Sequence, residues 1–306
     1  KTIKSKLTKA IPTNSNVIVK FHDIHKMKKK INSFKWWGQL QELDFIKSHL
    51  HKLKTLNSEY DLNELFHNQH IYLSSVLFEQ YENNLLLITS ITESQAKSHK
   101  LMRTINSSDN KPRYYENIQI NNIKIGEDNI EVFFTKYQDI FMLSFSSIAI
   151  EESIRQLKYG KDLFKLSPIN NLDQNLPKYS DVNILIRTNT LEKIIGHNNI
   201  FLNSNTWSWF DVELEKNHIL LNGVTNRGNI KYLLDSQYNN AQKSKIEDIL
   251  PRHTTGFYSY QIKNLSDLNE VINSVSEGVH ENIYHLTNTW HPTEINISYN
   301  QSNELM

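Results

Sequence analysis

The sequence predicts an α+β fold: a mostly antiparallel sheet, helices packed on one side of it, and repeated strand–helix units. Three observations support this class. Short β-branched and aromatic runs alternate with stretches whose apolar residues recur every three or four positions. Several strand-like runs follow one another across short polar turns, as they do in hairpins. Glycine (8) and proline (6) are scarce among the 306 residues, which argues against propellers and glycine-rich rolls.

The first strand–helix unit lies near the start of the chain. Pro12 and the small polar residues after it predict a turn, and Val17 to Phe21 predict a strand. Asp23 is placed to cap a following helix. A second helix is predicted over 37–56, where leucine and isoleucine residues recur at helical spacing.

Strands dominate the middle of the chain. The runs 71–78 and 85–90 predict a hairpin, because a polar turn separates two β-rich segments. Further strands are predicted over 118–125, 130–136, 140–145, 182–187, 207–214 and 218–224, with helices starting near 151 and behind Thr188.

The segment after residue 249 repeats the opening pattern. Pro251 corresponds to Pro12, Thr254 to Ser15, and a strand over 256–260 to the first strand, with an amphipathic helix expected after it. We therefore expect a polar lead-in over 1–9, a main α+β unit over 10–248 and the start of a second similar unit over 249–306.

The first residue indicates what preceded the lead-in. The chain opens at Lys1 without methionine, which indicates either a chain trimmed at its start or a mature form whose signal or anchor has been left out. The longest apolar run, 140–150, is shorter than the roughly 20 residues that a membrane-spanning helix needs.

Charge is unevenly distributed along the chain. Residues 1–54 hold 13 lysines and 3 acidic residues, a balance of +10, so the remainder carries −9 of the net +1. Two interpretations stay open: attraction to phosphate or anionic lipid, or a solvated tether followed by one polar helix face. The lysines lack the interleaved arginine and aromatic residues typical of single-strand binding, so no nucleic-acid partner is expected.

The residue types present exclude several chemistries. The absence of cysteine excludes disulfides, thiol nucleophiles and thiolate-bound metals. No nucleophile elbow, phosphate-binding glycine loop or H-E-x-x-H motif occurs. His22 and His25, like His67 and His70, are spaced i, i+3, which could place each pair on one helix face around a metal; we interpret them as surface or capping residues. The sequence thus predicts no catalytic residue, metal site or cofactor.

One strand carries the best candidate binding surface. Trp207, Trp209, Asp211 and Glu213 alternate along it and share a face. An aromatic–acidic strip of this kind could bind sugar or a cation, or pair with a partner protein. A half-exposed face of an ordinary sheet gives the same pattern, and the sequence does not separate these alternatives.

Several segments together resemble a known protein family. They are Ala10-Ile11-Pro12 with its strand, Trp37 with its helix, the hairpin 71–90, the run 207–214 leading to Asn222-Gly223, Ile249-Leu250-Pro251, and Trp290 with Glu294-Ile295. In these the chain resembles an uncharacterised bacterial family labelled domain of unknown function 3352. The resemblance implies an exported protein of the cell envelope, periplasmic or at the cell surface and anchored by its N-terminus. It supplies no catalytic residues.

These observations favour a non-catalytic, envelope-tethered binding or assembly protein whose partner is an envelope protein or polymer. The alternative is a hydrolase that acts on envelope polymers with residues scattered along the sequence. A pocket with converging histidine and carboxylate side chains would favour the hydrolase. Steep salt-dependent DNA binding would favour a third class, a basic-arm nucleic-acid binder.

Overall fold

A computed structural model describes residues 7–67, 69–78, 82–106, 112–166, 169, 182–188, 190, 207–216, 218–225, 249–251, 254–261 and 294–300. The chain divides into two compact units, the first holding 1–190 with 206–226, and the second 191–205 with 227–306. The division expected at 248–249 lies within the second unit. Within the described ranges, no helix is long and apolar enough to cross a membrane.

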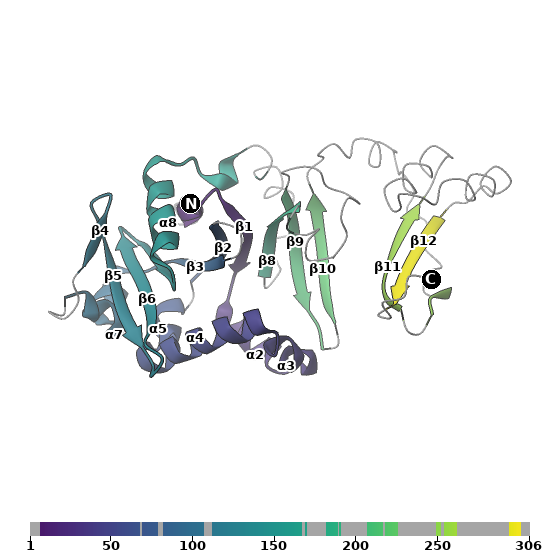
Figure 1. The fold of residues 1–306 in the computed structure, drawn as a ribbon, viewed down its shortest axis with the longest axis horizontal. Coiled ribbons are helices and arrows are strands. Elements are labelled where there is room, and N and C mark those ends of the chain that lie inside the picture. Colours follow the sequence, from purple (N-terminus) through teal and green to yellow (C-terminus); the bar gives the residue numbers. More distant parts are fainter. Residues whose placement is uncertain are drawn as a thin grey trace. The chain divides into compact units, whose positions relative to one another are not determined.

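The first unit is built on a ten-stranded sheet in the order β10-β9-β8-β1-β2-β3-β7-β6-β5-β4 (Figure 1). All neighbouring strands pair antiparallel, which confirms the predicted α+β class with an antiparallel sheet. The strands are β1 (Ser15–Phe21), β2 (Ile71–Phe78), β3 (Glu82–Ser90), β4 (Arg113–Tyr115), β5 (Ile118–Ile125), β6 (Ile130–Tyr137), β7 (Ile140–Ser144), β8 (Val182–Arg187), β9 (Trp207–Leu214) and β10 (Ile219–Thr225). The predicted hairpin over 71–90 is the β2–β3 pair.

Most of the described helices of this unit are short, and the two long ones are α4 (Asp44–Tyr60) and α8 (Ser147–Tyr159). The other helices are α2 (Ile24–Ile31), α3 (Lys35–Gln41), α5 (Leu62–Phe66), α6 (Glu93–Ser98) and α7 (Lys100–Arg103), with 3-10 turns η1 (Thr8–Ala10), η3 (Thr104–Asn106) and η4 (Leu163–Lys165). As expected, Asp23 caps α2: its side chain accepts a hydrogen bond from the Lys26 backbone N–H at 2.9 Å.

Helices cover both faces of the sheet, whereas we expected them on one side. Successive residues of a strand point to opposite faces, and each face here has its own core. Ile88 and Met142 pack with α8, whereas Leu87 and Phe141 pack with α4 and α5 (Figure 1). The central strands are apolar at consecutive positions, so both of their faces need a cover that excludes water.

The single helix predicted over 37–56 is two helices. α3 ends with tight turns, in which Glu42 N–H donates to Gln39 and Leu43 N–H donates to Leu40, each at 3.2 Å. Leu43 then takes an extended conformation, is 53% exposed and precedes α4. The apolar spacing continues through this break, which is why periodicity alone did not show it.

The core of the first unit begins before residue 10. Leu7 and Thr8, which we placed in a polar lead-in, are 2% and 6% exposed. Leu7 packs in the same core as α8, and Thr8 Oγ1 donates to Asp162 Oδ2 at 3.0 Å. In the same region Ser153 on α8 donates to the Ala10 carbonyl oxygen at 2.5 Å. These contacts anchor the first turn of the described chain to α8 and η4.

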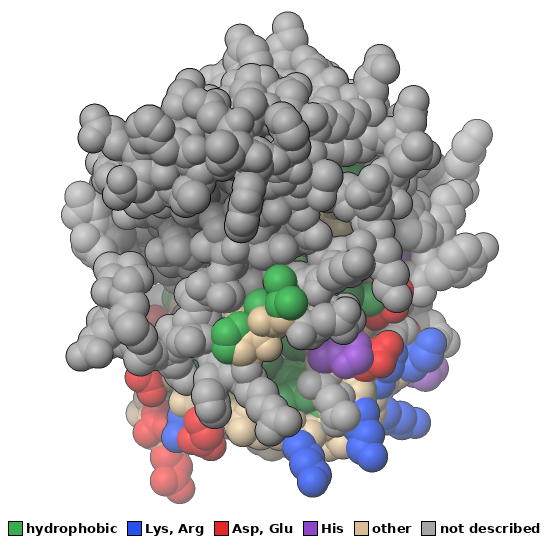
Figure 2. Space-filling model, turned by 90° about the vertical axis from the view of Figure 1, so that its right-hand side faces the viewer, with side chains coloured by type: hydrophobic (Ala, Val, Ile, Leu, Met, Phe, Trp, Pro, Cys, Tyr) green, Lys and Arg blue, Asp and Glu red, His purple; other side chains and the backbone are tan. Residues whose placement is uncertain are grey.

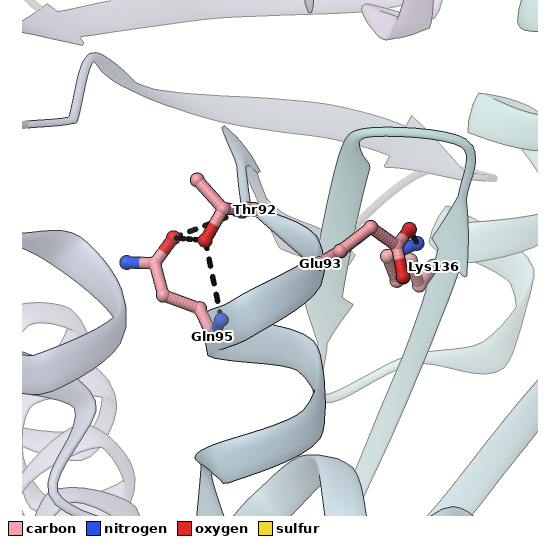
Figure 3. Close-up of polar contacts among 4 residues, drawn as sticks. All are labelled: Thr92, Glu93, Gln95 and Lys136. Carbon is pink, nitrogen blue, oxygen red and sulfur yellow. Dashed lines mark hydrogen bonds and ion pairs between the residues drawn. The ribbon is translucent and has the colours of Figure 1, made fainter.

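The helix α6 begins with a capping box (Figure 3). Thr92 Oγ1 accepts a hydrogen bond from the Gln95 backbone N–H at 3.2 Å, and Gln95 Oε1 accepts one from the Thr92 backbone N–H at 2.9 Å. The next residue, Glu93, forms an exposed ion pair with Lys136 of β6 at 2.8 Å. The cap satisfies backbone donors that the first helical turn leaves without partners.

The second unit is described by one antiparallel pair, β11 (Thr254–Gln261) with β12 (Glu294–Asn300). β11 is the strand predicted after Pro251. The helices predicted behind Thr188 and after residue 260 lie outside the described residues.

Candidate functional site

The predicted strip lies on β9, and most of it is inside the protein. Trp207, Trp209 and Asp211 are 4%, 2% and 4% exposed, and of the four only Glu213 is exposed. The predicted alternation holds, because both tryptophans belong to the core under α8 whereas Val212 belongs to the core on the other face. A surface strip needs exposed indoles, so the expected exposure of this face is wrong. A binding role for these residues stays a prediction.

Aromatic packing explains why the indoles are buried. The Trp209 ring meets Phe164 of η4 edge to face, with centroids 5.6 Å apart, and Phe164 meets Tyr72 of β2 at 6.1 Å. Edge-to-face pairs of this kind add to the stabilisation that burial itself gives. Phe164 lies far from β9 in the sequence, so strand alternation could not reveal this cover.

Trp207 lies beneath a half-buried arginine. The Arg187 guanidinium is 4.6 Å from the Trp207 ring centroid and donates hydrogen bonds to the carbonyl oxygens of Ser15 and Thr13, at 2.9 and 2.7 Å. Burial lowers the pKa of Arg187 below its ordinary value. Arg187 therefore connects three strands: it belongs to β8, its guanidinium lies over Trp207 of β9, and its N–H groups bind backbone carbonyl oxygens at the start of β1.

A polar chain runs from Asp211 to the end of β1. Asp211 Oδ1 accepts a hydrogen bond from Asn183 Nδ2, and Asn183 Oδ1 lies 2.7 Å from His22 Nε2. Because the Asn183 amide nitrogen donates to Asp211, the amide oxygen faces the histidine. His22 Nε2–H is therefore the donor of the hydrogen bond that Asn183 Oδ1 accepts. Lys20, also buried, faces Asn183 across the β1–β8 pair.

Sequence reasoning singled out Asp211 and His22 separately but did not connect them. The link is Asn183 of β8, which lies between β1 and β9 in the sheet. Asn183 faces Lys20 on one side and Asp211 on the other in the strand register. The only sequence signal was a polar residue inside an apolar strand, since a buried amide needs partners.

The end strand of the sheet exposes apolar side chains. Among the described residues, β10 has one neighbouring strand, β9. Figure 2 shows a small group of hydrophobic side chains at the surface of one face of the molecule. The exposed aliphatic residues of β10, with their exposed fractions, are Ile219 (42%), Leu220 (40%), Leu221 (52%) and Val224 (40%). β10 contains no charged residue and no proline, the devices that usually protect an edge strand.

Two other observations bear on the expected chemistry. In the part of the chain that the structure describes, no group of three or more histidine, cysteine or acidic side chains is arranged to hold a metal ion. The lysines at positions 28–30 fall in the last turn of α2, where positive charge interacts favourably with the helix dipole. The attraction of the basic N-terminal region to lipid or phosphate stays a prediction.

Comparison of this chain with known proteins found no relative. No family model, no curated protein and no solved structure matches this chain.

Proposed function

We propose that this chain is a non-catalytic binding or assembly protein that takes up an extended strand of a partner protein along β10. The observation that supports the proposal is the exposure of aliphatic side chains along an edge strand with no charge to protect it. An edge strand presents backbone donors and acceptors that pair with another strand.

The distribution of exposed side chains indicates a strand as the occupant. Ile219 and Leu221 face Leu214 and Val212 across the β9–β10 pair, whereas Leu220 and Val224 face Glu213 and Trp209. The two sets therefore lie on opposite faces of the sheet. A helix covers one face, but an added strand extends both faces at once and places apolar side chains beside both sets.

Site-specific crosslinking in the native cell tests this proposal. A photoreactive residue at Leu221 (52% exposed) is compared with one at Tyr114 (64% exposed), which lies on β4 at the other end of the sheet. We expect position 221 to crosslink to one defined protein, which is then purified. The double variant Leu221→Lys/Val224→Lys should lose binding to that protein, and Tyr114→Lys should retain it.

Three outcomes would overturn the proposal. They are crosslinks of equal yield from both positions, binding that survives lysine substitution on β10, and crosslinks to a second copy of this chain. The last result would replace a partner protein with self-association. Circular dichroism of each variant separates a lost interface from a lost fold.

We also propose that the two units are repeats of one design. The support is a shared strand start. The backbone N–H of Ser15 donates to Pro12 at 3.1 Å, and that of Thr254 donates to Pro251 at 3.0 Å. In both strands a register shift follows between this residue and the second residue after it. An experimental structure of the second unit with unlike strand order around β11 would contradict the proposal.

The proposed location is the bacterial cell envelope, with an N-terminal tether. Its support is the resemblance of short segments, such as Ala10-Ile11-Pro12 and Ile249-Leu250-Pro251, to the family labelled domain of unknown function 3352; no family model matches the chain. Fractionation of the native cell tests it. The full-length protein should sediment with membranes and be reached by protease added after the outer layers are opened; recovery in the cytosolic fraction would contradict the location.

One observation favours the alternative, a hydrolase acting on envelope polymers. The chain Asp211–Asn183–His22 orients an imidazole, as a general base requires. The test is release of soluble fragments from purified envelope polymer by the wild-type chain and by His22→Ala. Release that is lost in the variant would favour the hydrolase; release by neither protein would remove it.

A further inference from the structure

Four histidines form two ring contacts between the β1–α2 connection and the α5–β2 connection. His22 and His25 follow β1 and open α2, and His67 and His70 lie between α5 and β2. The structure pairs them across the two connections, not within each one. The ring centroids of His22 and His70 are 5.5 Å apart, and those of His25 and His67 are 5.7 Å apart.

These separations suit two imidazoles bound to one metal ion. With metal–nitrogen bonds of about 2 Å and a tetrahedral angle between them, two imidazole centroids lie about 5 Å apart. The His25 and His67 rings are inclined at 53°. Binding of one metal ion by both rings requires a nitrogen of each ring to point toward a common position between them.

His25 supplies the second, independent observation. Its Nε2 atom is buried and has no hydrogen-bond partner among the described residues. A buried ring nitrogen without a partner is uncommon in a folded protein, because its lost hydration is not replaced. A metal ion bound at Nε2 would supply the missing interaction.

The neighbouring groups allow an ion to enter and remain. His67 is exposed, so the site opens to solvent on that side. The Asp23 carboxylate caps α2 two residues before His25, which places a negative charge at the helix end where a cation would otherwise meet the positive end of the dipole. Lys26 is exposed.

We propose that His25 and His67 together bind a late first-row transition-metal dication as its two protein ligands. Water takes the remaining positions, because no third histidine or acidic side chain is arranged around the pair in the described ranges. Neutral imidazole is a good ligand for zinc, copper and nickel, whereas magnesium prefers oxygen. The proposal does not depend on the β10 interface.

Calorimetric titration of the full chain with zinc chloride at pH 7.5 tests the site. We expect one saturable site in the wild-type protein and no heat of binding with magnesium chloride. His25→Ala/His67→Ala should weaken zinc binding at least about tenfold, because both protein ligands are removed. His67→Ala alone, at an exposed position, should weaken binding without disturbing the fold.

The matched control is His51→Ala/His218→Ala. These exposed histidines lie 3.5 Å from Asp128 and Glu215, respectively, so each is an imidazole–carboxylate pair outside the proposed site. We expect the control to retain wild-type affinity. The proposal is overturned if the wild-type chain does not bind zinc, if both His67 variants bind it as the wild type does, or if the control loses it.

Discussion

His22 Nε2 lies 2.7 Å from Oδ1 of Asn183, a residue 161 positions further along the chain. The contact connects the end of β1 to β8, and the hydrogen bond from Asn183 to Asp211 extends it to β9. Two of these three residues, Asn183 and Asp211, are buried at 4% exposure. Because buried polar groups need partners, this chain constrains how the three strands align.

Asn183→Ala should destabilise the protein by about 1–3 kcal/mol, because it removes a donor from a buried carboxylate. Urea unfolding of the full chain, followed by circular dichroism, measures the change. Asn222→Ala is the matched control, since Asn222 faces Asp211 across the β9–β10 pair but is exposed. It should change stability by less than about 0.5 kcal/mol. Equal effects of the two substitutions would contradict the role given to the polar chain.

Trp209→Ala should cost about 3–5 kcal/mol, because it removes a buried indole that packs against Phe164. Glu213→Ala on the same strand face is exposed and should cost less than about 0.5 kcal/mol. Denaturant titration distinguishes the two. Loss of ligand binding in a Trp209 variant would therefore report the fold, so Glu213 is the position at which to test direct binding. A Trp209 variant with wild-type stability would show that the indole is not part of the core.

Gly223→Ala should destabilise the β9–β10 pair, because a Cβ atom at this position overlaps the carbonyl oxygen of Trp209 and the ring of Phe210. Overpacking of this kind costs about 1–3 kcal/mol. Gly38→Ala is the control, since a Cβ atom there meets no atom within 4 Å and the residue lies in helix α3. It should be neutral or stabilise by about 0.5–1 kcal/mol. Thermal unfolding measures the stability of both variants. Equal stability changes for Gly223→Ala and Gly38→Ala would contradict the packing described at β10.

Thr92→Ala should cost about 1 kcal/mol, because it removes the side-chain cap of α6 (Figure 3). Thr92→Ser keeps the hydroxyl oxygen and should retain most of the stability that the cap provides. Hydrogen exchange of the α6 amides measures local opening directly. Unchanged exchange in the alanine variant would show that the capping box does not hold this helix end.

Glu93 should give a small dependence of stability on pH. Its hydrogen bond with Lys136 lowers the pKa of the carboxyl group from its ordinary value of 4.5. A group whose pKa is lower in the folded state stabilises the fold above its unfolded pKa and loses that contribution as the pH falls through the folded pKa. The effect is small because the pair is exposed. The free energy of unfolding is measured for the wild type and for Glu93→Gln from pH 6 to pH 3. The difference between the two proteins should shrink toward low pH; a difference that grows would contradict the predicted sign.

Local sequence patterns predicted much of the sheet. The β1 strand, the Asp23 cap and the β2–β3 hairpin were predicted because short-range rules govern them: alternation, turn residues and capping. The break at Leu43 was missed because the leucine spacing continues through it. The second layer of helices was missed, although the consecutive apolar residues of central strands such as β7 (Ile140–Ser144) indicate burial on both faces.

The site was less predictable, for a physical reason. Alternation correctly placed Trp209 and Asp211 on one face, but exposure depends on what covers that face, and Phe164 comes from a distant segment. The histidines were paired by sequence spacing, as His22 with His25. Strand register instead brings His22 to His70. Contacts set by tertiary pairing leave little trace in local periodicity.

The most direct test of strand addition at β10 is amide hydrogen exchange of the chain alone and in its complex with the partner captured at position 221. Strand addition should slow the exchange of β10 amides in the complex, whereas the exchange of β4 amides, at the opposite end of the sheet, should be unchanged. Unchanged exchange along β10 in a stable complex would contradict it.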